Sequence, residues 1–497
     1  MTTKTSPQPI VSIVIPTHNR CAILKRTLDA LNQQTFPAQQ FEVLVVVDGG
    51  RDGTSEMLRG YQASFPLMVI EQASQGAAAA RNRGTAQAKG SLLLFLDDDV
   101  VPRPGLVAAH VAAHQIQGRH VGIGPYPPVI QSSLSSYFHA KVRGWWAAKF
   151  DELQQPGHRF SYQDLLSGNM SIEADTFVHL GGFNTNPIFQ AHEDYEIGIR
   201  LIQSNVAIRF VPEAVSDHYE TMNMKRTLDR ARQEGRADIT IGQQYPELRS
   251  TLPVVTSFES MKLRYQAALL IFPFLWSSFG RGLTKVSVPI LRGLEALKLS
   301  RYWDQFYSFC HWYWYWWGVI DQLKNWRNIA AFVRNREDYF YEPEPMVEIS
   351  LDQGWEKAAQ LLDEQRPAGA KIWYGHQLVG IISPQPGFEP LQGRHLGAIL
   401  TTTLAVPLLE ALALEGIVAP SNIINKYELA EAVKSKSRWF GPSRFSQMWY
   451  EQYAQWNHLQ AIKEKQSEPP PNSTSSWSSP LEKINYPEVY SEISHEK

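Results

Sequence analysis

The sequence contains little cysteine, no uninterrupted apolar segment long enough to span a membrane and no large excess of positive or negative charge. Two cysteines in 497 residues, Cys21 and Cys310, provide neither a disulfide framework nor a zinc site, so a reducing cytoplasm is the expected compartment. Residues 1–8 are polar and predict a flexible N-terminus without a signal peptide. The net charge of −2, the pI near 6.7 and the lack of a basic aromatic platform exclude nucleic acid as an expected partner.

The two longest apolar stretches are poor candidates for membrane spans. Residues 269–276 form a run far shorter than the about 20 residues that a spanning helix needs. Residues 396–414 are longer, but Pro407, Glu410 and three consecutive threonines favour a buried helix. The chain length predicts two to four domains.

Strands and helices alternate in the first hundred residues. Short β-branched or leucine-rich runs predict strands at residues 11–15, 41–47, 67–70 and 92–96, and apolar residues at helical spacing predict helices at 21–33 and 76–88. This alternation predicts an α/β fold with a mostly parallel, doubly wound sheet.

Three polar clusters follow predicted strands, at residues 17–20, 48–54 and 97–99. Ligands of such sheets bind outside the carboxyl ends of the strands, so we expect the clusters to form one site. The third cluster, Asp97-Asp98-Asp99, crowds three like charges, and oxygen ligands of this kind suit Mg²⁺ or Mn²⁺. The alternative is a solvated acidic turn after a strand.

Seven short motifs then identify a family resemblance. Residues 9–219 resemble a family 2 glycosyltransferase, an inverting, nucleotide-sugar-dependent enzyme with the GT-A fold, in motif order and spacing. The matching segments are residues 14–20 (VIPTHNR), 47–54 (VDGGRDGT), 80–84 (ARNRG), 95–99 (FLDDD), 168–171 (GNMS), 181–183 (GGF) and 193–201 (EDYEIGIRL).

The resemblance implies a donor site for a nucleoside-diphosphate sugar, with a UDP-sugar expected first. It implies that Asp48 accepts hydrogen bonds from the base and that Thr17 lines the same pocket, that Arg81 reaches the base or phosphate, and that Asp97 faces the ribose. Asp52 is the alternative to Asp48, although a helix-capping role explains it equally well, and Arg83 competes with Arg81.

The resemblance also assigns the reacting groups. It implies that Asp99 binds Mn²⁺ or Mg²⁺, that His218 completes the metal shell, and that Asp194 is the general base. Glu193 is the competing carboxylate, which we assign to substrate binding. Because successive side chains of a strand alternate, we expect Asp98 to point away from Asp99.

The predicted organisation places a GT-A domain at residues 9–224, a helical aromatic-rich region at 225–345, a small α+β accessory module at 346–420, a helical extension at 421–466 and a disordered tail at 467–497. Basic residues within 262–317 and the aromatic run 312–317 suit helices on an anionic membrane surface, which would put the site at the inner face of the plasma membrane near a lipid-linked acceptor. A packed aromatic core or a homo-oligomer interface uses the same residues.

The predicted function is therefore sugar transfer from a nucleoside-diphosphate sugar to a carbohydrate or lipid-linked acceptor, in cell-envelope or exopolysaccharide synthesis. One alternative is a non-catalytic scaffold or membrane-surface protein with the same fold. The intact Asp97, Asp99 and Asp194 argue against it, because folding requires none of them. The other alternative is a sugar nucleotidyltransferase, whose usual glycine-rich phosphate loop with a lysine is absent near Pro16.

Overall fold

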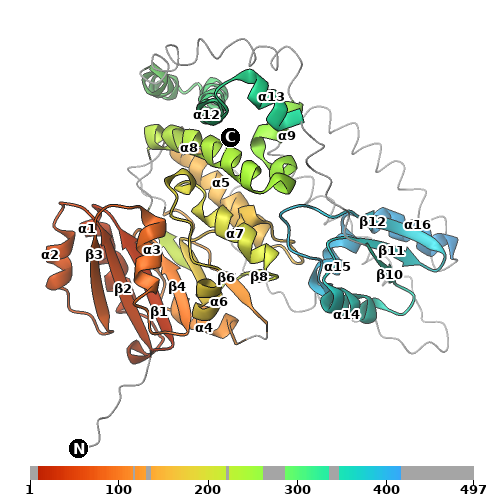
Figure 1. Cartoon of the computed structure of the whole chain (residues 1–497), viewed down its shortest axis with the longest axis horizontal. Helices are drawn as coiled ribbons and strands as arrows, with labels where there is room; N and C mark the ends of the chain where they lie inside the picture. The colour runs from red at the N-terminus through yellow and green to blue at the C-terminus, as the bar shows by residue number, and fades with distance from the viewer. Residues whose placement is uncertain are drawn as a thin grey trace, which may run out of the picture. The chain divides into compact units, whose positions relative to one another are not determined.

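The computed structural model describes residues 9–115, 118–129, 136–219, 223–260, 286–334 and 346–415. All of them lie within one compact unit, residues 1–418 (Figure 1). The predictions for the N-terminus, the apolar run 269–276, the helical extension and the disordered tail fall outside the described residues.

A seven-stranded sheet forms the first part of the fold, as the alternation of strands and helices predicts (Figure 1). Four neighbouring strands, β3, β2, β1 and β4, are parallel, β7 is antiparallel to both of its neighbours, and β6 is parallel to β8. The mostly parallel α/β fold is therefore confirmed. In spatial order the strands are β3 (Leu67–Gln72), β2 (Phe41–Asp48), β1 (Val11–Thr17), β4 (Leu92–Leu96), β7 (Asn169–Glu173), β6 (His120–Ile123) and β8 (Ala207–Phe210).

Helices connect these strands. The predicted helices at 21–33 and 76–88 are present but slightly shorter, at residues 21–31 and 77–85. A two-stranded ribbon joins β5 to β9 in antiparallel pairing. The connecting elements are α1 (Cys21–Leu31), η1 (Ala38–Gln40), α2 (Thr54–Arg59), α3 (Ala77–Thr85), β5 (Val100–Pro102), α4 (Leu106–Ala113), α5 (Tyr137–Leu153), η3 (Tyr162–Asp164), α6 (Ala174–His179), η4 (Pro187–Phe189), α7 (Glu193–Gln203) and β9 (Ser216–His218).

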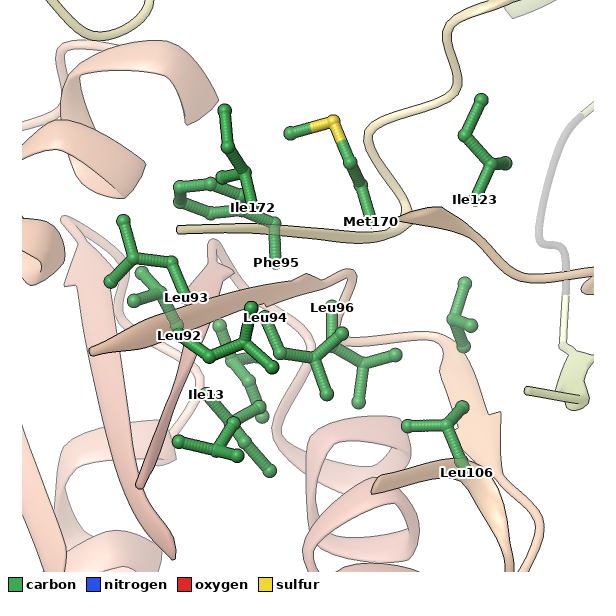
Figure 2. Packing of buried hydrophobic residues seen from close by; sticks show 14 of the residues in the cluster. Ile13, Leu92, Leu93, Leu94, Phe95, Leu96, Leu106, Ile123, Met170 and Ile172 are labelled. Atoms are coloured by element: carbon green, nitrogen blue, oxygen red, sulfur yellow. The ribbon is translucent and has the colours of Figure 1, made fainter. Parts of the chain in front are cut away.

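Aliphatic side chains of the central strands build the core of this sheet. All five residues of β4 are buried, and they pack with Ile13 of β1 and with Met170 and Ile172 of β7 (Figure 2). A strand that is buried on both faces reads as a continuous apolar run, which is why residues 92–96 show no polar alternation. The polar side chains that follow β4 are therefore held at the edge of a rigid sheet.

A helical aromatic layer follows the sheet, and two of its helices approach each other very closely. It contains α8 (Met224–Gln244), η5 (Pro246–Thr251), α9 (Pro253–Ser260), a helix at residues 286–296, α12 (Ser300–Leu323) and α13 (Trp326–Arg334). A Cβ atom on Gly235 of α8 would lie 2.1 Å from the Tyr315 carbonyl oxygen of α12, and one on Gly318 would lie 2.0 Å from that of Arg232. Only glycine permits this contact between backbones.

Four rings of the aromatic run 312–317 are buried within this layer. The exposed fractions are 1% for Trp314 and 0% for Trp316, and Tyr313 and Tyr315 are also buried. These four rings thus belong to the packed aromatic core that the sequence left as one alternative. Among the described residues no single helix has the length and hydropathy of a membrane span, although one bent pair of helices passes that test together.

The bent pair lies in the small α+β module at residues 346–415. The apolar and aromatic runs at residues 371–374 and 378–382 predict a β-hairpin with a three-residue loop at 375–377. The hairpin is present, with a two-residue turn in place of that loop, and β10 adds a parallel strand beside β11. The predicted helix over 396–414 is wrong as one element, because two helices meet there at 80° around residues 402–404. The elements are β10 (Val347–Ser350), α14 (Trp355–Gln365), β11 (Ala370–Tyr374), β12 (Gln377–Ile382), α15 (Gly393–Thr401) and α16 (Ala405–Leu414).

Candidate active site

The three predicted polar clusters meet at the carboxyl ends of β1, β2 and β4. The strands run parallel in register, so that Thr17 and Asp48 end neighbouring strands and the aspartate triplet follows the next one. The hydroxyl of Thr17 donates to Asp98 Oδ2 at 2.7 Å, and a ring nitrogen of His18 lies 2.7 Å from the carbonyl oxygen of Asp48. The structure therefore brings the clusters together, although Thr17 contacts the triplet and not Asp48.

Asp48 organises the loop that begins α3. Its carboxylate accepts hydrogen bonds from the backbone N–H groups of Gln75 at 2.7 Å and Gly76 at 2.8 Å, and from the Gln72 side chain at 2.8 Å. Burial raises the pKa of Asp48, but these donors outweigh burial and hold the pKa below its usual value. Asp48 is thus an ionised acceptor at neutral pH.

Asp52 has the capping role that the sequence left open. It accepts hydrogen bonds from the backbone N–H of Cys21 at the start of α1 and from that of Thr54 at the start of α2. Both helices begin beside the site, so Asp52 fixes their first turns.

The aspartate triplet lies in a turn, and this corrects the expected direction of Asp98. β4 ends at Leu96, so the alternation of a strand does not extend to residues 97–99. The Arg20 guanidinium instead holds Asp98 Oδ1 at 2.9 Å and also Asp99 Oδ2, so both carboxylates face the same cation. Burial, with a further contribution from Asp99, raises the pKa of Asp98 to about 7, although Arg20 opposes the rise.

The second oxygen of Asp99 faces His218. Asp99 Oδ1 lies 3.7 Å from His218 Nε2, and this pair forms where β5 and β9 run side by side. Two ligands that bind one ion at about 2.0–2.2 Å lie up to about 4.4 Å apart, so the spacing fits a shared divalent cation. Although burial raises the pKa of Asp99, His218 and Arg20 outweigh it and keep the pKa low, which favours the ionised form that binds a metal.

Arg81 joins the triplet to the start of α7. Its guanidinium is buried and donates to Asp97 Oδ1 at 2.7 Å and to Glu193 Oε1 at 3.2 Å. Arg83, the competing residue, is exposed. Burial disfavours the charged form of Arg81, but the two carboxylates outweigh this cost and raise its pKa.

Asp194, the predicted base, is half-buried in the first turn of α7. Burial and the charge of Glu193 raise its pKa to about 6, while the positive charges of His192 and Arg230 oppose the rise. A carboxylate with this pKa is ionised at neutral pH and still basic enough to accept a proton.

A buried network connects the start of α7 with the aromatic layer. His192 Nε2 lies 3.2 Å from Asp238 Oδ1 of α8, and the Tyr315 hydroxyl of α12 donates to Asp238 Oδ2 at 2.5 Å. The His192 ring also stacks on Tyr195 at 4.3 Å. Burial lowers the pKa of His192, but Asp238 and the nearby Glu234 outweigh burial and raise it.

An aromatic wall lies beside the triplet. The Tyr126 ring is 5.0 Å from that of Trp146 and 5.6 Å from that of His218. A Cβ on Gly168 would lie 3.0 Å from Asp97 Oδ2 and 3.2 Å from the Tyr126 hydroxyl, so this glycine lets the wall approach Asp97.

Sequence reasoning assigned no role to Arg20, Tyr126, His192, Arg230 or Asp238. Arg20 and His192 stand next to recognised motif residues, which was the available signal. Tyr126, Arg230 and Asp238 carried none, because they reach the site through tertiary contacts with Asp97, Asp194 and His192.

A separate group, Glu152, His158 and Asp164, also has the spacing of a possible metal site. The ammonium of Lys149 already contacts both Glu152 and Asp164. This group is therefore a local ion-pair cluster, and its composition does not favour a divalent cation.

Comparisons with known proteins identify a family of related sequences. Two family models match: glycosyl transferase family 2 over residues 12–178 and the N-terminal domain of galactosyltransferase over residues 150–225. An uncharacterized glycosyltransferase of Haemophilus influenzae is 41% identical over 223 residues, covering 44% of this chain and 70% of that protein. The validoxylamine A glucosyltransferase of Streptomyces hygroscopicus is 29% identical over 333 residues, covering 60% of this chain and 75% of that protein.

One solved structure is a weaker likeness. The mannosyltransferase PcManGT from Pyrobaculum calidifontis, in complex with GDP-Man and Mn²⁺, is 16% identical with a TM-score of 0.40, covering 64% of this chain and 87% of that one.

Proposed function

This chain is a member of glycosyl transferase family 2 and hence a glycosyltransferase, and we propose that it inverts the anomeric carbon as it transfers a sugar from a nucleoside-diphosphate sugar to an acceptor hydroxyl. The observation that carries the proposal is the buried Arg81, which ties Asp97 to Glu193 and so holds the first turn of α7 beside the aspartate triplet. Donor-binding groups and a candidate base are thus supported as parts of one site.

In this proposal the donor nucleotide is bound by the loop around Asp48. Asp48 Oδ1 already accepts from both Gln72 and Gln75, so the base would donate to Oδ2. Oδ2 accepts from the Gly76 N–H at 2.8 Å, and its other contact, with the Ser74 hydroxyl, is long at 3.4 Å. Asp97 is the triplet residue whose side chain is partly exposed, at 36%, and it is available to the ribose hydroxyls. We place a UDP-sugar first among the donors.

Asp99 and His218 would hold Mn²⁺ or Mg²⁺, with Arg20 on the other carboxylate oxygen of Asp99. The ion, when bound, supplies Lewis-acid neutralisation of charge on the diphosphate leaving group. Arg20 keeps both Asp98 and Asp99 turned toward this position.

Asp194 acts as the general base. It takes the proton of the acceptor hydroxyl as the oxygen forms its bond to the anomeric carbon and the bond to the diphosphate breaks. Its pKa of about 6 supports this role, because the carboxylate is ionised and basic at neutral pH. We place the reaction in cell-envelope or exopolysaccharide synthesis.

Donor hydrolysis tests the proposal. Wild-type protein with Mn²⁺ or Mg²⁺ is incubated with UDP-, GDP- and dTDP-sugars, and nucleoside diphosphate release is compared with that of Asp99→Ala and Asp194→Asn. Asp151→Ala, which removes an exposed carboxylate of α5, is the control. Metal-dependent release that is lost in Asp99→Ala supports the proposal.

The opposite result would favour the scaffold alternative. If folded wild-type protein neither binds nor hydrolyses any nucleotide sugar in the panel, the catalytic proposal is wrong.

A further inference from the structure

An open surface cavity of about 250 Å³ lies beside the start of α7 and is used by none of the roles above. One side is formed by Gln190 and Ala191, and the other side is formed by one face of α8. The α8 residues that line it are Arg226, Asp229, Arg230 and Gln233.

The cavity borders both halves of the proposed active site. Gln190 and Ala191 stand shortly before Asp194 in the chain. The Gln190 amide nitrogen lies 3.9 Å from the position of a Cβ on Gly76, the residue whose N–H holds Asp48. The charge of Arg230 acts on Asp194 and opposes the rise of its pKa. A ligand in the cavity is therefore placed near both the base and the donor loop.

The lining carries an excess of positive charge. The carboxylate of Asp229 is paired with Lys225 at 2.9 Å, on the same helix. Arg230 uses its Nε for Glu234 at 3.1 Å. Arg226 forms no ion pair with any residue in the described part of the chain. The pairs Lys225–Asp229 and Arg230–Glu234 each cancel in charge, so the unpaired positive charge of the lining is the Arg226 guanidinium. Arg230 adds guanidinium N–H donors other than Nε, and Gln190 and Gln233 add two amide groups.

We propose that this cavity binds an anionic group of the acceptor, a carboxylate or a phosphate, and so presents the neighbouring hydroxyl to Asp194. A planar guanidinium pair matches either group, because both offer two acceptor oxygens to parallel N–H donors. The inference rests on the proposed transfer reaction and adds the chemical class of its acceptor.

Direct binding is the first test. Glucuronate, inorganic phosphate and, as the uncharged probe, glucose are titrated into the full-length protein by calorimetry, with wild type, Arg226→Gln, Arg230→Gln and Arg236→Gln compared. Arg236→Gln is the matched control, because it removes the same side chain from the same helix but outside the cavity lining, and Arg232 keeps its partner Asp321 paired. Loss of one charged hydrogen bond predicts about tenfold weaker anion binding in Arg226→Gln and in Arg230→Gln.

The two anions separate the possible sources of the charge. Tighter binding of glucuronate points to an acidic sugar, and tighter binding of phosphate points to a phosphorylated acceptor. The proposal is overturned if neither anion binds better than glucose, or if Arg236→Gln weakens binding as much as Arg226→Gln and Arg230→Gln.

Transfer to paired acceptors is the second test. Octyl glucoside, octyl glucuronide and octyl glucoside 6-phosphate are compared by kcat/KM, and the preference for an anionic acceptor should fall about tenfold in Arg226→Gln.

Donor hydrolysis without acceptor distinguishes a failure of the proposed function from a failure of the inference about the cavity. Its absence in wild type contradicts the proposed function, whereas hydrolysis without anion binding contradicts only the inference about the cavity.

Discussion

The sheet core and the aromatic helical layer are built from different side chains and contribute differently to the site. The sheet core is mainly aliphatic, and the strands that form it end in Thr17, Asp48 and the aspartate triplet. The second core joins aliphatic side chains of α8, such as Leu228 and Ile239, to aromatic side chains of α12, such as Trp314 and Trp316. It supplies Arg230 and Asp238, which act on Asp194 directly or through His192.

The sheet thus positions the reacting groups, whereas the helical layer adjusts the pKa of the general base. Parallel strands place reacting groups, because their carboxyl ends meet at one edge of the sheet. The helical layer sets the electrostatic surroundings of the base, because α8 brings both a cation and an acid close to the start of α7. The two cores should therefore respond differently to substitution.

The largest expected effect is that of Asp194→Asn, which should lower turnover and also change how the stability of the protein depends on pH. Asp194→Asn is expected to lower turnover by about 10²–10⁴-fold, because the amide cannot accept the proton. The folded carboxyl has a pKa of about 6, whereas the ordinary value of an aspartate is 3.8, so folding binds extra protons between these pH values. Wild-type stability should thus fall as pH rises through that window, and the variant should lack this loss.

Turnover assays with parallel denaturation curves at pH 4 and pH 7 measure this effect. Equal pH dependence of stability in wild type and Asp194→Asn would contradict the assigned environment of the base.

A smaller effect is expected where the two helices cross. Gly235→Ala should lower the free energy of unfolding by about 1–3 kcal/mol, because its Cβ would meet the Tyr315 carbonyl oxygen. Gly144→Ala on α5 is the control, since a Cβ there meets no atom within 4 Å and alanine should stabilise the helix by about 0.5–1 kcal/mol. Chemical denaturation measures both, and equal results would mean that the crossing tolerates displacement.

The network through His192 predicts a shift in pH dependence. Asp238→Asn removes the carboxylate that raises the pKa of His192, so the buried imidazole should lose its charge. The pKa of Asp194 should then rise above about 6, because His192 no longer opposes the effects of burial and Glu193. Arg230, Glu234, Tyr126 and Tyr195, which also surround the pair, stay in place.

The acidic limb of kcat/KM against pH should consequently move upward in Asp238→Asn and lower activity at pH 6 several-fold. Asp321→Asn is the matched control, because Asp321 also joins α12 to α8, through Arg232 and Arg236, and within the described part of the chain it forms no ion pair with α7. A limb that moves equally in both variants would assign the effect to helix packing.

A further comparison distinguishes the two aspartates of the loop at residues 48–54. Asp52→Ala should cost about 1 kcal/mol of stability through lost capping and leave nucleotide affinity unchanged. Asp48→Asn should weaken nucleotide binding about tenfold, because an amide cannot serve all the donors that Asp48 holds. Titration of UDP into both variants measures the difference. Equal affinities would mean that Asp48 does not bind the nucleotide base.

The sequence pattern predicted those elements whose structure depends on residues close together in the chain. The strand before the triplet and the hairpin near residue 375 were confirmed, because apolar runs and turn residues act over short distances. The single helix over 396–414 was wrong, since hydrophobicity predicts burial but not the bend of 80° that packing imposes. The direction of Asp98 was wrong because the strand ends before the triplet begins.

The sequence by itself determined the α/β fold, the edge of the sheet where polar groups gather and the identity of the motif residues. Buried strands require continuous apolar runs, and the residues that follow them are consequently recognisable. Only the tertiary structure decided that Arg81 joins Asp97 to Glu193, and that Asp238 lies against His192. Such pairs depend on contacts between residues far apart in the chain, and the charge that each group experiences depends on burial that no local pattern contains.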